Sequence, residues 1–166
     1  MTTAVDIRPR TGRDLPSCVA ALRQVHDADG YPAVWPENAA GWLSPPKLVD
    51  ARVAEAGGVV IGQVGIGESV LPAPVRAAVH DAEPISVVRL FVVPSHRRSG
   101  AGSRLLDAAV EMSGLRGRRA VLDVEAGGVA AISLYERAGW KRVHSGPGSW
   151  AFPDGRAAYL HYYLSP

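Results

Sequence analysis

The sequence predicts one mixed α/β domain that covers residues 1–166. Segments typical of β-strands alternate along the chain with segments whose apolar residues recur at helical spacing, which is the element order of a mixed α/β domain. A length of 166 residues suits a single domain with a sizeable core. Hydrophobic residues make up 47% and charged residues 20% of the chain, as in an ordinary globular protein.

The composition argues against several classes of function. The net charge is only +2, so we expect no binding to nucleic acid or to a membrane surface. No apolar run approaches the roughly 18 residues of a membrane span, and the N-terminus lacks the pattern of a secretory signal. Cys18 is the single cysteine, which fits a reducing cytoplasm. The abundance of Gly, Ala, Val and Arg over Lys suggests a GC-rich bacterial genome. These features predict a cytoplasmic, bacterial protein.

The first elements are a strand and a helix. Val5–Pro9 is a short strand candidate, and Thr11 or Asp14 can cap the helix that follows. Apolar residues then recur at helical spacing over 15–25.

A change of composition follows this helix. The segment 26–46 is rich in proline, aromatic and acidic residues, with a short helix expected near 39–43. After it, 51–56 and 59–66 flank Gly57-Gly58, which predicts a β-hairpin with the two glycines in its turn.

A long connection and a strand–loop–helix unit occupy the centre of the chain. The proline-punctuated connection 68–84 is of a length that is often functional. Residues 85–93 form an almost unbroken apolar run, typical of a strand buried on both faces. The six residues Arg97-Arg98-Ser99-Gly100-Ala101-Gly102 follow, and 103–112 carry apolar residues on one helical side. A glycine turn before a helix start predicts an anion site, most often for phosphate.

The last third predicts strand, helix and two closing strands. Residues 120–125 form a strand and 129–138 a helix that ends at glycine. Strands over 140–143 and 158–164 are expected to be joined by the Gly/Pro/Ser-rich segment 144–157. The basic cluster Arg116-Gly117-Arg118-Arg119 is expected in a solvated turn, and a second interpretation is that it contacts a phosphate.

Two sequence motifs indicate which phosphate-containing ligand the glycine loop would bind. No lysine follows Gly102, as a nucleotide hydrolase requires, and Leu105 stands where a dinucleotide fingerprint has its third glycine. The pattern Arg-x-x-Gly-x-Gly after a strand ending Leu90-Phe91-Val92 resembles motif A of the GNAT superfamily of N-acetyltransferases. The family's second signature, a strand and then a helix with Ala-x-x-Leu-Tyr and a closing Gly-Trp, is matched by Ala131 to Trp140. An ordinary glycine turn is the alternative interpretation of the loop.

The resemblance extends from about Val5 to Leu164 and implies a fold and a coenzyme. It implies a central, twisted, mixed and mostly antiparallel sheet of six to seven strands with about four helices. Acetyl-CoA would be the cosubstrate, with no metal. Tyr135 matches the family tyrosine that acts as general acid toward the departing sulfur, and a core aromatic is the alternative. Contacts to the coenzyme are implied for Phe91, Val92, Arg97, Arg98, Ser99, Gly100, Ala101, Gly102 and Ser103.

The sequence departs from the family pattern at three places. Gly128 replaces a common asparagine, Arg98 replaces a common glycine, and Ser86 stands where some relatives place a catalytic glutamate. The general base therefore stays open between a water chain and several side chains, namely Glu68, Glu83, His26, Asp27, Asp29 and His80.

The acceptor site is implied to lie in the segment after the first helix. Asp29, Tyr31 and Trp35 there, together with Glu68, are candidate substrate-binding residues, because carboxylates attract an ammonium group and aromatic rings cover its apolar body. The alternative is that the aromatic residues pack the loop onto the core.

The expected activity is acetyl transfer from acetyl-CoA to a primary amine of a small molecule or peptide, by direct attack in a ternary complex. A non-catalytic acyl-CoA sensor with the same fold is the alternative. The acceptor is not specified: an amino acid, a polyamine, an antibiotic amine and a protein N-terminus all fit. A homodimer is compatible with the family.

Overall fold

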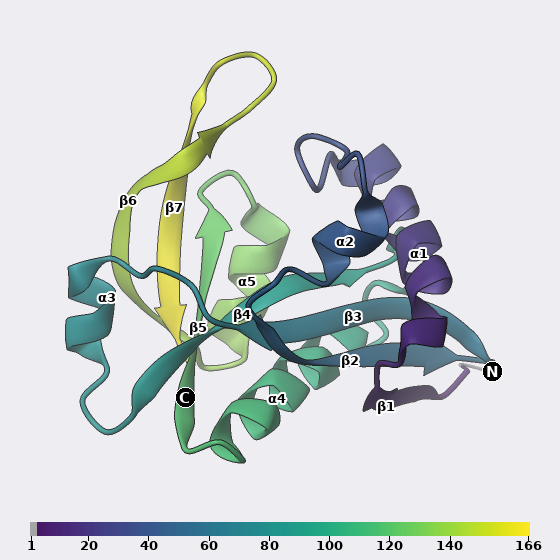
Figure 1. Ribbon diagram of the computed structural model, residues 1–166, viewed down its shortest axis with the longest axis horizontal. Helices are drawn as coiled ribbons and strands as arrows, with labels where there is room; N and C mark the ends of the chain where they lie inside the picture. Colours follow the sequence, from purple (N-terminus) through teal and green to yellow (C-terminus); the bar gives the residue numbers. More distant parts are fainter. Residues whose placement is uncertain (1–2) are drawn as a thin grey trace.

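A seven-stranded sheet with the order β1-β2-β3-β4-β5-β7-β6 organises the computed structural model, which describes residues 3–166 (Figure 1). Its strands are β1 (Val5–Pro9), β2 (Leu48–Ala56), β3 (Val59–Gly67), β4 (Glu83–Val92), β5 (Arg118–Glu125), β6 (Lys141–Ala151) and β7 (Ala157–Leu164). The helices are α1 (Leu15–Asp29), α2 (Ala39–Leu43), α3 (Ala73–Ala78), α4 (Ala101–Gly114) and α5 (Val129–Arg137). The predicted mixed sheet is confirmed.

The strands β4 and β5 form the one parallel pair in the described sheet, and they diverge. Their pairing covers Glu83–Ser86 against Arg118–Val121 and then stops, although both strands continue. The remaining pairs are antiparallel. The second half of β4 therefore has β3 on one edge and an opening on the other.

A β-bulge interrupts β4 beside this opening. Val88 pairs with Gly65 of β3, but Phe91 already pairs with Gln63, so Arg89 and Leu90 together face the single residue between. Arg89 has φ +55°, in the left-handed region that non-glycine residues seldom occupy. Bulges bend a strand and redirect its side chains.

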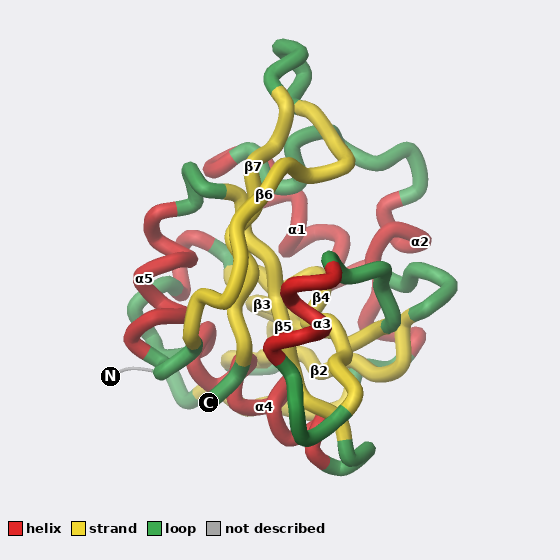
Figure 2. The backbone as a smooth tube through the Cα atoms, turned by 90° about the vertical axis from the view of Figure 1, so that its left-hand side faces the viewer, coloured by secondary structure: helices red, strands yellow, loops and turns green. Residues whose placement is uncertain are grey.

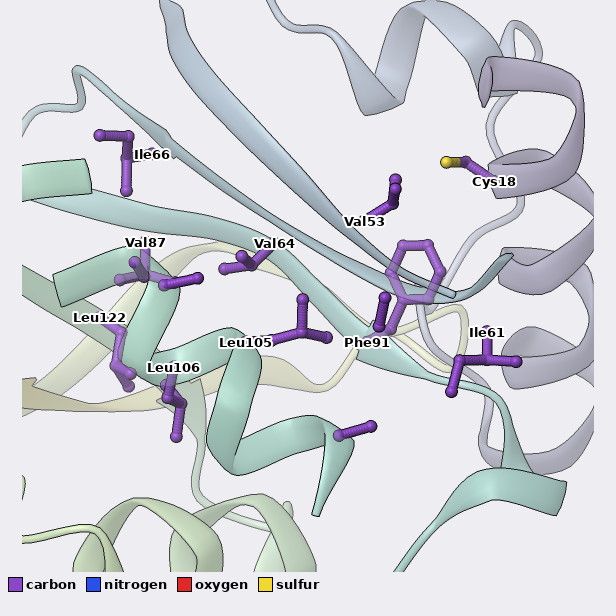
Figure 3. Close-up of a cluster of buried hydrophobic side chains, with 14 of the residues drawn as sticks. Cys18, Val53, Ile61, Val64, Ile66, Val87, Phe91, Leu105, Leu106 and Leu122 are labelled. Carbon is purple, nitrogen blue, oxygen red and sulfur yellow. The ribbon is translucent and has the colours of Figure 1, made fainter. Parts of the chain in front are cut away.

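The two faces of the sheet carry different helices. Gly62 of β3 lies against Leu105 of α4, while its neighbour Gln63 points toward the end of α2. Figure 1 shows α1 and α2 above the sheet and α4 below it. Figure 3 shows side chains of α1 and α4, including Cys18 and Leu105, directed toward strand residues such as Phe91. This packing forms one hydrophobic core that holds β3 and β4 in place.

The first helix has a charged anchor. The carboxylate of Asp14 accepts a 2.7 Å hydrogen bond from the N–H of Thr11 and two bonds from the guanidinium of Arg8, at 2.8 and 2.9 Å. Arg8 also pairs with Glu55 at 2.7 Å. These contacts lower the pKa of Asp14 well below its ordinary range, with the Arg8 hydrogen bonds as the largest cause.

Several elements differ from the sequence-based prediction. The strand β2 begins at Leu48 rather than at 51, and β5 begins at Arg118 rather than at 120. The connection after β3 contains helix α3, whose prolines at the N-cap and in the first turn suit a helix start. The strand β4 begins at Glu83, two residues early. The strand β6 runs to Ala151, through residues expected to form a loop, because an edge strand tolerates Pro147 and β7 pairs with it. Figure 2 shows the resulting long hairpin extending beyond the helices. Within residues 3–166, no helix has the length and apolar character that crossing a membrane requires.

Candidate active site

The glycine loop exposes main-chain N–H groups at the start of α4. Arg98 and Gly100 have φ values of +63° and +85°, and the first hydrogen bond into the helix runs from Arg104 N to Gly100 O at 3.1 Å. In the described chain, the N–H groups of Gly102 and Ser103 have no acceptor. Free N–H groups at the positive end of a helix dipole form an anion site.

The side chains of the loop divide into two groups. The Ser99 hydroxyl donates to His96 O at 2.5 Å, so it stabilises the loop itself. Arg98 is exposed and forms no ion pair among the described residues, while Arg97 forms an ion pair with Asp29 at the end of α1. Both arginines belong to the same loop as the exposed N–H groups and add positive charge to it.

The two sequence motifs touch each other. A Cβ atom on Gly102 would lie 3.0 Å from Cδ2 of Leu134, so α4 and α5 approach closely at this point. This contact places Tyr135, the next residue of α5, close to the helix start. A larger residue at 102 would require the Leu134 side chain to shift by a few tenths of an ångström.

The opening between β4 and β5 contains a free main-chain donor. The N–H of Val93 donates to Ile61 O of β3 at 2.8 Å. Because successive residues of a strand direct their N–H groups to opposite edges, the N–H of Val92 faces the diverging β5. Phe91 is buried and its N–H faces β3. Of these two residues, Val92 thus presents its N–H to the opening.

Tyr135 directs a free hydroxyl toward the same region. Its side chain is almost buried, with the ring 6.0 Å from that of Tyr163. The hydroxyl has no hydrogen-bond partner among the described residues, yet no buried polar side-chain atom is unsatisfied, so it reaches solvent. Burial raises the pKa of Tyr135, and the charges of Tyr31 and Asp123 raise it further. The phenol therefore stays protonated at neutral pH.

Asp123 is a candidate site residue that the sequence analysis did not name. It lies on β5 just beyond the last pair with β4 and opposite Tyr162 of β7. Its carboxylate lines a pocket of about 480 Å³ beneath the β6–β7 hairpin. Partial desolvation raises the pKa of Asp123, and the nearby Arg89 cation opposes that shift. The available signal was a carboxylate directly after the apolar run Ala120 to Leu122 of this strand.

Arg89 and Tyr31 lie across the opening from Asp123. The guanidinium of Arg89 stacks 3.8 Å from the ring of Trp42, and its Nε donates to Trp42 O at 3.0 Å. The ring of Tyr31 meets that of Trp42 edge-on at 5.9 Å. Desolvation raises the pKa of Tyr31 to about 12, with Asp123 adding to the shift and Arg89 opposing it. Tyr31, Arg89, Asp123 and Tyr135 thus influence one another electrostatically across one opening.

The other acceptor-site and base candidates lie elsewhere. Trp35 packs against His26 at 5.4 Å and Arg23 at 4.8 Å, on α1. Glu68 forms a two-bond pair with Arg118, at 2.6 and 3.0 Å, which lowers its pKa. Arg118 also contacts the carbonyl groups of β4 at its first residues, far along the strand from the glycine loop.

Two further positions have structural contacts. Ser86, at the position of the family's glutamate, is buried and bonds to the Ser69 hydroxyl. The basic cluster 116–119 follows the C-terminal end of α4, opposite the glycine loop, and its three arginines form ion pairs with Asp50, Glu68 and Asp81. This position does not fit the interpretation that the cluster contacts the same phosphate.

The comparisons with known proteins agree with these features. The model of the acetyltransferase (GNAT) family matches residues 19–140. The ribosomal-protein-alanine N-acetyltransferase of Brucella melitensis is similar in structure, with a TM-score of 0.73, 22% identity and coverage of 96% of this chain and 98% of that one. An N-acetyltransferase of Staphylococcus aureus has a TM-score of 0.73, 20% identity and 98% coverage of both chains. Arabidopsis thaliana NAA60 in complex with acetyl-CoA has a TM-score of 0.70, 20% identity and 97% coverage of both. The chain belongs to the acetyltransferase (GNAT) family.

Proposed function

We propose that the protein transfers an acetyl group from acetyl-CoA to a primary amine of a small molecule or peptide, by direct attack in a ternary complex. The observation that carries this proposal is the convergence of Asp123, Tyr135 and the free N–H of Val92 on the opening between β4 and β5. Membership of an acetyltransferase family and the acetyl-CoA complex of the similar Arabidopsis structure support it.

The glycine loop is the part that binds the donor. The N–H groups of Gly102 and Ser103 and the guanidinium groups of Arg97 and Arg98 match the charge of a pyrophosphate. A chain extending from this loop into the opening brings its thioester to the N–H of Val92. That N–H group then stabilises, by a hydrogen bond, the negative charge that develops on the thioester carbonyl oxygen.

Asp123 and Tyr135 divide the proton transfers. An alkylammonium group titrates near pH 10, so the amine must lose a proton before it attacks. We assign that proton to the carboxylate of Asp123, directly or through one water molecule. The nitrogen–carbon bond forms, the carbon–sulfur bond breaks, and the hydroxyl of Tyr135 protonates the departing thiolate. The attacking nitrogen loses a second proton as the amide forms. One of the two protons from nitrogen restores Tyr135 through solvent and the other leaves Asp123 for solvent, so the products are an amide, a free thiol and one proton.

Release of coenzyme A thiol from acetyl-CoA, measured over a panel of primary amines, tests the proposal. A Tyr135→Phe variant should lose 10- to 100-fold in kcat, with its dissociation constant for CoA unchanged. Tyr159→Phe is the matched control, because Tyr159 is exposed on the opposite face of β7 from Tyr162. Coenzyme binding without turnover of any amine would favour the acyl-CoA sensor, and an unchanged rate in Tyr135→Phe would remove the acid assignment.

A further inference from the structure

Arg89 has two unused hydrogen-bonding nitrogens in the acceptor cleft. Its Nε bonds to Trp42 O at 3.0 Å, but neither terminal nitrogen has an acceptor in the part of the chain that the structure describes. No buried polar side-chain atom lacks a partner, so both terminal nitrogens reach solvent. Stacking on Trp42 holds the guanidinium plane in one orientation. A fixed guanidinium with two free terminal nitrogens can donate two hydrogen bonds to a carboxylate.

Arg89 and Asp123 border the same opening without forming an ion pair. Arg89 lies three residues past Ser86, and Asp123 two residues past Val121, in the last pair between β4 and β5. Among the described residues they come no closer than the 4.0 Å limit for a salt bridge, and each alters the pKa of the other. The opening therefore has one cation on the β4 side and one anion on the β5 side. A zwitterion fits that arrangement, with its ammonium group toward Asp123 and its carboxylate toward Arg89.

A pocket for a third substituent opens beside Asp123. The 480 Å³ pocket is lined by four polar residues, Ser69, Asp123, Ser149 and Tyr162, by Gly148 and by six apolar side chains. Those apolar side chains are Val70, Leu71, Pro72, Pro147, Trp150 and Leu160. An apolar side chain of moderate size is the complementary occupant.

We propose that the acceptor is a free α-amino acid with an apolar side chain, and that Arg89 binds its carboxylate. This inference rests on the proposed acetyl transfer to a primary amine. In such an acceptor one carbon atom carries all three groups. The amine would meet Asp123, the carboxylate would meet Arg89, and the side chain would enter the pocket. A peptide N-terminus lacks the carboxylate at that distance and would leave Arg89 unpaired.

The decisive measurement compares L-phenylalanine with L-phenylalanine amide as acceptors. Wild-type protein should favour the free acid by at least about tenfold in kcat/KM, since a charge-assisted hydrogen-bonded pair commonly contributes that much. In Arg89→Gln the preference should fall to about one, mainly through KM of the acid, while the amide keeps its rate within a few-fold. Arg89→Lys should restore part of the preference.

A matched control and a binding assay separate the possible failures. Arg13→Gln removes the same charge from an exposed residue at the far end of α1 and should leave the preference intact. Calorimetry of N-acetyl-L-phenylalanine and its amide, with CoA present, reports on the carboxylate site without turnover. Equal binding of acid and amide by wild type, or a preference that survives in Arg89→Gln, overturns the inference. Absence of turnover together with carboxylate-dependent binding refutes the proposed function and leaves the carboxylate site standing.

Discussion

The buried amide of Gln63 should stabilise both the sheet and the bulge of β4. Gln63 is fully buried on β3, where its Oε1 accepts from Arg10 at 2.8 Å and its Nε2 donates to Arg89 O at 3.0 Å. A Gln63→Met substitution keeps the length of the side chain and removes both bonds. Arg10 retains its bonds to Leu43 O and to the Ser44 hydroxyl, but the carbonyl group of Arg89 loses its side-chain donor.

The cost of this substitution follows from the two bonds. Loss of the hydrogen bond to a charged group costs about 1.5–3 kcal/mol, and an unpaired buried carbonyl costs about 1–3 kcal/mol. Burial of the apolar methionine side chain offsets about 1.5–2 kcal/mol of that. We therefore expect the free energy of unfolding to fall by about 2–3 kcal/mol.

Urea unfolding measures this change directly. With a slope of about 2 kcal/mol per M, the midpoint should move down by about 1–1.5 M. The control is Ile61→Val, a buried residue on the same strand, which should lower the free energy of unfolding by about 0.5–1.5 kcal/mol. If Gln63→Met lowers stability no more than this control does, the amide does not stabilise the bulge.

Three further outcomes are expected. Asp123→Asn should lower kcat by about 10²–10⁴-fold. The wild-type rate should rise with pH as Asp123 loses its proton, at its raised pKa, and the pH–rate profile of the variant should lack this rise. Arg98→Gly should leave the free energy of unfolding within about 0.5 kcal/mol, because relief of the positive φ offsets the chain entropy of glycine, while calorimetry should show weaker CoA binding. Asp14→Asn should lower the free energy of unfolding by about 2–3 kcal/mol at pH 7. Because folding lowers the pKa of Asp14, the variant should show this full loss of stability above pH 4 and a smaller loss in urea titrations at lower pH.

The periodic elements of the fold follow from local sequence. The apolar residues of α4 recur at helical spacing, and β4 is a long apolar run, so each pattern predicts one type of element. The glycine loop between them is predictable because its free N–H groups suit an anion. Helix α3 escaped prediction because its six residues are too few to show a period and lie among prolines that also suit a loop.

The acceptor side of the site depends on contacts that sequence spacing does not contain. Asp123 becomes accessible only because the pairing of β4 with β5 ends at Ser86 and Val121, two residues before it. Glu68 seemed equally suited as a carboxylate near an amine, but Arg118, fifty residues later, forms an ion pair with it. Such a choice between two carboxylates is made by tertiary neighbours, which one sequence does not reveal.

The bulge of β4 explains why a donor N–H and a cation occur at the same opening. Before the bulge, the register of β4 against β3 would place Val92 opposite Ile61. The extra residue shifts that partner to Val93, whose N–H bonds to Ile61 at 2.8 Å. The N–H of Val92 is thereby turned from β3 to the opening. Because the same insertion places Arg89 at φ +55° with its side chain on Trp42, one irregularity in the strand positions both groups of our proposals: the N–H for the thioester and the cation for the acceptor.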